Sequence, residues 1–228
     1  MNSGTGPGAI TPDGCAVELY ALLGPKAEPD LIATALRPGG SILELGCGAG
    51  RVTHALIERG YRLTAVDQSP EMLARVKDAA VVLADIETLA LADTFDAVLL
   101  GSYLIHTPSD RTRADLLATC RRHVNAGGVV LIERLGADFF HAAEVGPTRE
   151  HSGTLACWRK IERHERTFSA TIEYRHPRGT WTQTFTLAIL SDDELFAALE
   201  AAGLRFECWL DDEQRWLQAR QAQPCGGK

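Results

Sequence analysis

The sequence predicts an α/β fold in which a doubly wound, mostly parallel sheet of seven strands has helices on both faces. Between residues 41 and 133, short apolar strands alternate with helical segments, which is the pattern of a parallel sheet. After residue 136 the apolar residues recur at every second position, as in antiparallel strands. We therefore expect an N-terminal helical cap, the seven-stranded sheet, and an antiparallel β insertion after strand five.

The N-terminal part is predicted to cap the sheet. Residues 1–12 are rich in Gly, Pro, Ser and Thr and are expected to be mobile. Residues 16–23 and 28–36 are predicted as two short helices, separated by Gly24-Pro25. We expect one domain over residues 1–228, with the cap in residues 1–40 and the insertion, acting as a lid, in residues 136–190.

The parallel part follows in regular order. Gly60 ends its first helix, and Ser69 is the expected N-cap of the next helix, with Pro70 at the first helical position. The predicted strands are residues 42–45, 62–66, 81–83, 95–100 and 129–133, the first helix is residues 51–59, and the last helix of this part is residues 110–123.

The antiparallel part is predicted from two rows of alternating residues. Phe168, Ala170, Ile172 and Tyr174 form one apolar row, and a second row begins at Trp181. A turn at residues 176–179 joins them into a hairpin, and residues 158–166 are expected to add a third strand. The sequence Ser191-Asp192-Asp193-Glu194 predicts a capping box, and the helix it opens ends at Gly203. The last strands are expected at residues 205–210 and 215–221.

The most informative motif lies at the end of the first predicted strand of the sheet. Glu44 is followed by glycines at positions 46, 48 and 50, and glycine lets a backbone turn sharply and approach a ligand closely. A dinucleotide-binding fingerprint, G-x-G-x-x-G or A, would require a small residue where this sequence has Arg51. The loop therefore favours a different nucleotide ligand.

This acidic glycine loop resembles that of class I S-adenosylmethionine-dependent methyltransferases, and three later features agree with the resemblance. Asp67 ends the second strand, Asp85 follows the third, and Gly101-Ser102-Tyr103 follows the fourth. The resemblance implies S-adenosylmethionine as cofactor, S-adenosylhomocysteine as product, and methyl transfer to O, N or C of a small molecule. It covers residues 41–133 well.

The resemblance also implies the cofactor contacts, which should meet at the carboxyl edge of the sheet. The acid and glycines of the loop would line the methionine part, Asp67 and Gln68 the ribose, and Asp85 and Ile86 the adenine. Alternatively, the glycines form an ordinary strand-to-helix turn and either aspartate is a turn or cap residue. The expected cofactor-binding residues are Tyr20, Glu44, Gly46, Cys47, Gly48, Gly50, Arg51, Asp67, Gln68, Met72, Ala84, Asp85, Ile86, Gly101 and Ser102.

His106 and Tyr103 are the candidate catalytic residues, because both follow strand four, where the acceptor would meet the methyl group. The alternative for His106 is a loop histidine that is hydrogen-bonded to the backbone. His54 and His123 lie on predicted helices and are expected at the surface. The expected substrate-binding residues are Tyr20, Tyr103, His106, His141, Tyr174 and Gln183.

Composition argues against several classes of partner. The net charge of −7 disfavours nucleic acid, which is bound largely through Lys and Arg. No apolar run approaches the roughly 18 residues of a membrane span, and the N-terminus lacks a signal pattern, so we expect a cytoplasmic protein. The six cysteines form no C-x-x-C pair, and no aspartate between Asp96 and Asp110 could coordinate magnesium, so we expect no metal.

Two other classes of function stay open at this point. One is a protein that binds S-adenosylmethionine without transferring its methyl group, either as a non-catalytic partner or as an enzyme that uses another carbon for alkylation or cyclisation. The second is an NAD-dependent oxidoreductase, which shares the doubly wound fold. Arg51 and Asp85 argue against the oxidoreductase. The acceptor and the oligomeric state are left open.

Overall fold

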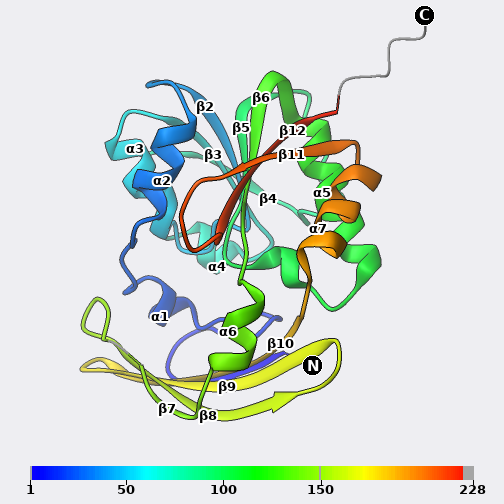
Figure 1. Cartoon of the computed structure of the whole chain (residues 1–228). Helices are drawn as coiled ribbons and strands as arrows, with labels where there is room; N and C mark the ends of the chain where they lie inside the picture. The colour runs from blue at the N-terminus through cyan, green and yellow to red at the C-terminus, as the bar shows by residue number, and fades with distance from the viewer. Residues whose placement is uncertain (1, 149, 223–228) are drawn as a thin grey trace, which may run out of the picture.

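The computed structural model describes residues 2–148 and 150–222, and these residues form two sheets (Figure 1). The larger sheet has the strand order β11-β12-β6-β5-β2-β3-β4. Strands β2 to β6 run parallel, β12 pairs antiparallel with β6, and β11 pairs antiparallel with β12. This confirms the predicted mostly parallel, doubly wound sheet of seven strands. Its strands are β2 (Ser41–Leu45), β3 (Arg62–Asp67), β4 (Ala80–Leu83), β5 (Phe95–Leu100), β6 (Val124–Glu133), β11 (Leu204–Trp209) and β12 (Trp216–Gln221).

Helices cover both faces of this sheet because successive strand residues point to opposite sides. In β2, Ile42 packs with Ile32 and Leu56 on one face, and Leu43 packs with Leu117 and other apolar residues on the opposite face. The first face is covered by α2 (Glu28–Ala35) and α3 (Arg51–Glu58), and the second by α5 (Asp110–His123) and α7 (Asp192–Ala201). The short helices are α1 (Val17–Tyr20), α4 (Pro70–Leu73), α6 (Ala137–Ala142) and the 3₁₀ turn η1 (Leu104–His106).

The second sheet is the predicted antiparallel insertion, joined by one N-terminal strand (Figure 1). Its strand order is β1-β10-β9-β8-β7, with every neighbouring pair antiparallel. Phe168 and Ala170 of β9 are buried against Phe140 of α6, as the alternating pattern predicts. The strands are β1 (Ser3–Thr5), β7 (Gly146–Pro147), β8 (Leu155–Arg163), β9 (Thr167–His176) and β10 (Gly179–Ala188).

Predicted caps and turns are present at the expected positions. The Ser69 side chain accepts a hydrogen bond from the Met72 backbone, and Ser191 and Glu194 form a reciprocal capping box. The helix predicted at residues 110–123 has these bounds in the structure. The division into one domain with a cap and a lid stays a prediction.

The N-terminal segment differs from expectation, because residues 3–5 form strand β1 on the edge of β10. Trp181 of β10 is 1% exposed, and its indole N–H donates to the Pro7 carbonyl at 2.8 Å. The N-terminal segment is therefore ordered by two contacts. It pairs with the edge strand β10, and its Pro7 carbonyl accepts the hydrogen bond of the buried Trp181 indole. Helix α6 and strand β7 were also absent from the predicted elements, and β6 starts at Val124, five residues before the predicted residue 129.

The prediction that His123 lies at the surface is wrong. Its side chain is fully buried, its Nε2 accepts from the Leu91 backbone at 2.9 Å, and its Nδ1 bonds the Thr119 carbonyl at 2.9 Å. A neutral imidazole satisfies one donor and one acceptor in this way. His54 is half-buried, and its Nε2 accepts from the Lys77 backbone.

Candidate active site

The glycine loop turns over the carboxyl ends of β2 and β3. The backbone N–H groups of Gly46 and Cys47 both donate to the Val66 carbonyl, at 2.9 and 3.0 Å. Gly48 has φ +55°, and a Cβ added there would meet nothing within 4 Å. A Cβ on Gly46 would instead lie 2.7 Å from the Leu104 side chain. The loop therefore turns bare backbone towards open space at Gly48, as a cradle for a ligand requires.

Asp67 holds this loop from the end of β3. One carboxylate oxygen accepts from the Gly48 backbone at 2.8 Å, and the other accepts from the Ser69 backbone at 2.9 Å. Burial raises the pKa of Asp67, although the two backbone hydrogen bonds oppose the rise. Each oxygen keeps a lone pair, so Asp67 can fix the loop and still accept from a diol.

Glu44 lies beneath the loop, where it is 6% exposed and accepts a 2.6 Å hydrogen bond from the Thr53 hydroxyl of α3. Burial raises the pKa of Glu44 to about 7. Its carboxyl group therefore stands between the ionised and protonated forms near neutral pH. A cation bound above the loop would favour the ionised form.

Charged groups gather beside the loop, around the start of α3. The Arg51 guanidinium lies 2.5 Å from the Glu28 carboxylate of α2. Glu133, at the end of β6, is 7% exposed and accepts from the Ser102 backbone at 2.7 Å. Burial raises the pKa of Glu133, and the nearby Arg51 opposes the rise. Carboxylates outnumber cations in this group of side chains, so a ligand bound beside them would be favoured if it were positively charged or neutral.

The backbone after β5 is strained where it borders this cluster. Ser102 and Tyr103 have φ of +53° and +60°, a region that costs side chains other than glycine about 1–2 kcal/mol each. Burial and the neighbouring Glu133 raise the pKa of the Tyr103 phenol, so the phenol stays protonated and can donate a hydrogen bond. Tyr103 also packs against the apolar cluster of the second sheet. Tyr103 thus lies between the two sheets, beside Glu133.

His106 does not have the surroundings of a general base. It is 1% exposed, its Nδ1 lies 2.8 Å from the Ala188 carbonyl, and its Nε2 accepts from the Leu135 backbone at 2.9 Å. Burial lowers the pKa of His106 to about 4. Both ring nitrogens are occupied, so the structure agrees with the backbone-bonded alternative. We therefore correct the assignment of His106 to catalysis and substrate binding.

Two predicted substrate residues, Tyr20 and Gln183, form a hydrogen-bonded group with Cys15, and a third, Tyr174, packs against the same apolar cluster as Tyr20. The Tyr20 hydroxyl donates to the Gln183 side chain at 3.2 Å, and the Gln183 amide donates to Cys15 Sγ at 3.2 Å. Burial raises the pKa of Tyr174 to about 12, with the Cys15 thiol as the second cause. Cys15 and Tyr20 also pack against Ala49 of the glycine loop and Met72 of α4. This group, here called the roof cluster, joins the second sheet to the cofactor loop.

The remaining predicted residues are more scattered. Gln68 and Asp85 are exposed beside the ends of β3 and β4, and Ala84 and Ile86 are half-buried there. His141 is exposed on α6, away from the hydrogen bonds that define the loop and the roof cluster. The structure thus gathers the glycine loop, Arg51, Asp67, Met72 and the residues after β5, and leaves His141 apart.

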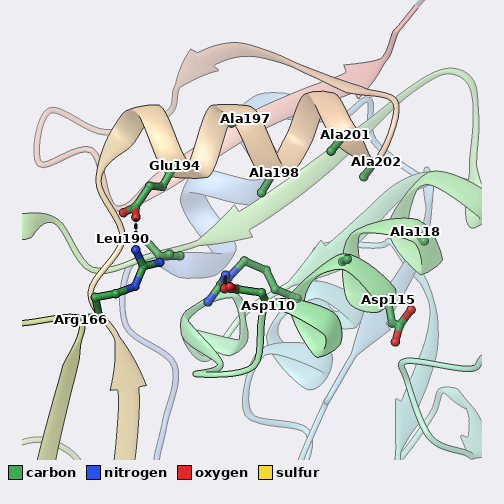
Figure 2. A pocket seen from close by; sticks show the side chains of 12 residues that line it. Asp110, Asp115, Ala118, Arg166, Leu190, Glu194, Ala197, Ala198, Ala201 and Ala202 are labelled. Carbon is green, nitrogen blue, oxygen red and sulfur yellow. Dashed lines mark hydrogen bonds and ion pairs between the residues drawn. The ribbon is translucent and has the colours of Figure 1, made fainter.

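Two cavities lie outside this site. One cavity, of about 580 Å³, lies between α5 and α7, and its lining includes several alanines together with Asp110, Arg166 and Glu194 (Figure 2). The other, about 710 Å³, lies by the opposite edge of the sheet, near Gly40 and Asp96. Neither is lined by a predicted cofactor or substrate residue.

Among the described residues there is no group of three or more His, Cys, Asp or Glu that could hold a metal, and no helix long and apolar enough to span a membrane.

Together, the fold and this edge define a Rossmann-like nucleotide-binding protein, and comparisons with known proteins are consistent with that class. Residues 43–132 match the family described as "Methyltransferase domain". The malonyl-[acyl-carrier protein] O-methyltransferase of Serratia marcescens is 33% identical over 160 residues, which are 64% of this chain and 58% of that protein. The dTDP-4-amino-2,3,4,6-tetradeoxy-D-glucose N,N-dimethyltransferase of Saccharopolyspora spinosa is 28% identical over 195 residues, 78% and 76% of the two chains.

A similar fold occurs in the sugar N-methyltransferase KedS8 from a Streptoalloteichus species. The TM-score is 0.71 at 21% identity, with 96% of this chain and 98% of that chain covered. Residues 43–132 are therefore similar to a methyltransferase domain, and the chain as a whole has the Rossmann-like fold of S-adenosylmethionine-dependent methyltransferases.

Sequence reasoning missed three residues that shape the site. Glu133 could have been found, because it ends the fifth strand at the same edge as Asp67. Glu28 and Cys15 carry no such signal, since their contacts with Arg51 and Gln183 depend on how distant segments pack.

Proposed function

We propose that this protein transfers the methyl group of S-adenosylmethionine to a small-molecule acceptor. The observation that carries the proposal is the bare backbone at Gly48, open to space and bonded to the Asp67 carboxylate. Bound S-adenosylmethionine would supply an electrophilic methyl group on a sulfonium, so the protein's main task is alignment. The relatives' names support the proposal, although the malonyl-[acyl-carrier protein] relative is matched over 58% of its length.

The cofactor residues have distinct proposed roles. Asp67 accepts the ribose hydroxyls, with Gln68 beside it, and Arg51 pairs with the methionine carboxylate. Asp85 and its neighbours Ala84 and Ile86 border the adenine. These roles are supported by the positions of the residues at one edge of the sheet and by the acidic character of the cleft, which suits a sulfonium.

For the acceptor, we propose a site between Tyr103 and the roof cluster. Tyr20, Tyr174 and Gln183 come from α1, β9 and β10 and carry phenol and amide groups, and Tyr20 packs against Ala49 of the glycine loop. Such groups recognise a polar, uncharged part of a ligand by hydrogen bonding. His141 stays a prediction without a structural argument in its favour.

Within this proposal, an amine is the favoured acceptor. The carboxyl groups of Glu28, Glu44 and Glu133 outnumber the Arg51 guanidinium beside the loop, and His106 is engaged with the backbone. An amine needs only to lose its own proton to become a nucleophile, whereas a hydroxyl needs a stronger base. The Saccharopolyspora relative is named for dimethylation of an amino sugar, which agrees with this choice.

The test is calorimetric binding followed by transfer of labelled methyl groups. We expect S-adenosylhomocysteine to bind and NAD to leave no heat, and we expect label from methyl-labelled S-adenosylmethionine on amino sugars and not on the matching hydroxy sugars. Tight NAD binding would overturn the proposed function. Label on the hydroxy sugars alone would overturn the amine assignment, and label from another carbon of the cofactor would favour alkylation or cyclisation.

A further inference from the structure

An ion pair ties the helical cap to the cofactor loop. Glu28 opens helix α2 and is 6% exposed. One of its carboxylate oxygens lies 2.5 Å from Arg51, and the other accepts from the Lys26 backbone at 2.6 Å. The Arg51 guanidinium outweighs the effect of burial and lowers the pKa of Glu28, so the carboxylate is ionised at neutral pH. Glu28 is thus fixed on both sides.

Arg51 keeps donors for a ligand. It follows Gly50 directly, at the first position of α3, and its side chain is 22% exposed. A guanidinium has five N–H donors in a rigid fork, and one nitrogen is used for Glu28. Against the effect of burial, Glu28 and, to a smaller extent, Glu133 and Glu44 raise the pKa of Arg51, so the guanidinium keeps its charge. One side of the fork is therefore held by Glu28, and among the described residues its other N–H groups have no hydrogen-bond partner.

We infer that Glu28 is a positioning residue that aims the Arg51 fork at the carboxylate of the cofactor's methionine part, so that the cap helix α2 takes part in cofactor binding. This inference rests on the proposed function. A guanidinium loses less conformational freedom on binding when one side is already held, and a bidentate pair requires its orientation to be fixed. Because α2 belongs to the cap, cofactor binding and the position of the cap are coupled through this ion pair.

The same two helical segments carry a matched control. Asp30 of α2 lies 2.5 Å from Arg59, the C-cap of α3, and the two side chains are 75% and 35% exposed. This pair also joins α2 to the α3 segment, but at the end of α3 away from the glycine loop. Glu28→Gln and Asp30→Asn each remove one carboxylate charge from an ion pair between these two segments. Only Glu28→Gln does so next to the glycine loop, where the cofactor is proposed to bind.

The experiment measures the affinity of the full chain for S-adenosylhomocysteine and for its decarboxylated analogue, which lacks only the carboxylate. We expect Glu28→Gln to weaken S-adenosylhomocysteine about 10-fold, the size of one partly lost charged contact. Its affinity for the decarboxylated analogue should stay within about twofold of wild type, and Asp30→Asn should leave both affinities unchanged. A purely structural role of Glu28 would weaken the two ligands equally, and that result would overturn the inference.

A double-mutant cycle provides the second measurement. If Glu28 acts through Arg51, Glu28→Gln should cause no further loss in an Arg51→Met background. Additive losses would overturn the inference, as would unchanged affinity in Glu28→Gln alone. If the wild-type chain binds no S-adenosylhomocysteine, the proposed function itself is wrong, and this result is distinct from one in which wild type and Glu28→Gln bind equally.

Discussion

At the scale of single residues, the edge of the sheet that carries the glycine loop depends on hydrogen bonds between backbone N–H groups and carboxylates. The left-handed backbone at Gly48 lets its N–H reach Asp67 while its missing Cβ leaves space above the loop. Glu133 has the same type of role on the other side of the cleft, because it holds the strained Ser102 backbone. The site is therefore built from backbone groups that the carboxylates of Asp67 and Glu133 keep in place.

Gly48→Ala tests this view against Gly39→Ala. Both glycines have positive φ, +55° and +76°, and a Cβ at either would meet nothing within 4 Å. Each substitution should lower the free energy of unfolding by about 1–2 kcal/mol through backbone strain. Gly48→Ala alone should also weaken S-adenosylhomocysteine at least about 10-fold, because the methyl group enters the cradle. Equal ligand affinity in the two variants, measured by calorimetry, would contradict the position of the cofactor over Gly48.

At the scale of elements, the sequence is informative where a pattern is long enough to repeat. The rows in β9 and β10, the caps at Ser69 and Ser191 and the helix at residues 110–123 were all predicted from local signals. Strand β1 has three residues and no period, and its partner β10 lies more than 170 residues away. Its formation follows from the unpaired edge of β10, which the N-terminal sequence does not reveal.

Deleting residues 1–8 should therefore destabilise the second sheet. The deletion removes the β1 ladder and the Pro7 carbonyl that accepts from Trp181. We expect a loss of about 1–3 kcal/mol in the free energy of unfolding, in keeping with a few lost hydrogen bonds and a newly exposed indole. Urea denaturation followed by tryptophan fluorescence measures both effects. Ser3→Ala with Thr5→Ala keeps the backbone ladder and should change stability by less than about 0.5 kcal/mol. If the deletion changed stability no more than this control, β1 would have no structural role.

At the scale of the whole molecule, His106 joins the two sheets. It follows β5 of the parallel sheet, bonds the Ala188 carbonyl at the end of β10, and accepts from Leu135 just after β6. The Ala188 partner is 82 residues away along the chain, so a sequence can place His106 near the site but cannot show that both nitrogens are occupied. His106 is thus better explained as a structural residue that hydrogen-bonds the two sheets to each other than as a catalytic residue.

This role predicts a pH dependence of stability. The pKa of His106 is lowered from 6.5 to about 4 in the folded protein, so between these values the unfolded chain binds a proton that the folded chain does not. The contribution of neutral His106 is complete above about pH 6.5 and falls by up to about 1.4 kcal/mol per pH unit below it. The pKa of Glu44 is raised to about 7, so between pH 4.5 and 7 this residue makes the folded protein more stable as the pH falls, which is opposite to the effect of His106. The contribution of Glu44 must therefore be subtracted by comparing two proteins that both contain it.

His106→Gln makes this comparison, because Glu44 is present in both proteins and its effect cancels in the difference. At pH 7 the variant should be less stable than wild type by about 1–3 kcal/mol, the cost of leaving buried backbone groups without a partner. The difference should shrink as the pH falls from 6.5 towards 4.5, and urea denaturation at a series of pH values measures it. His141→Gln, which changes an exposed histidine, should show neither effect. A stability difference that stays constant with pH would show that His106 is not held neutral between the two sheets, and a variant as stable as wild type but slow in methyl transfer would return His106 to a catalytic role.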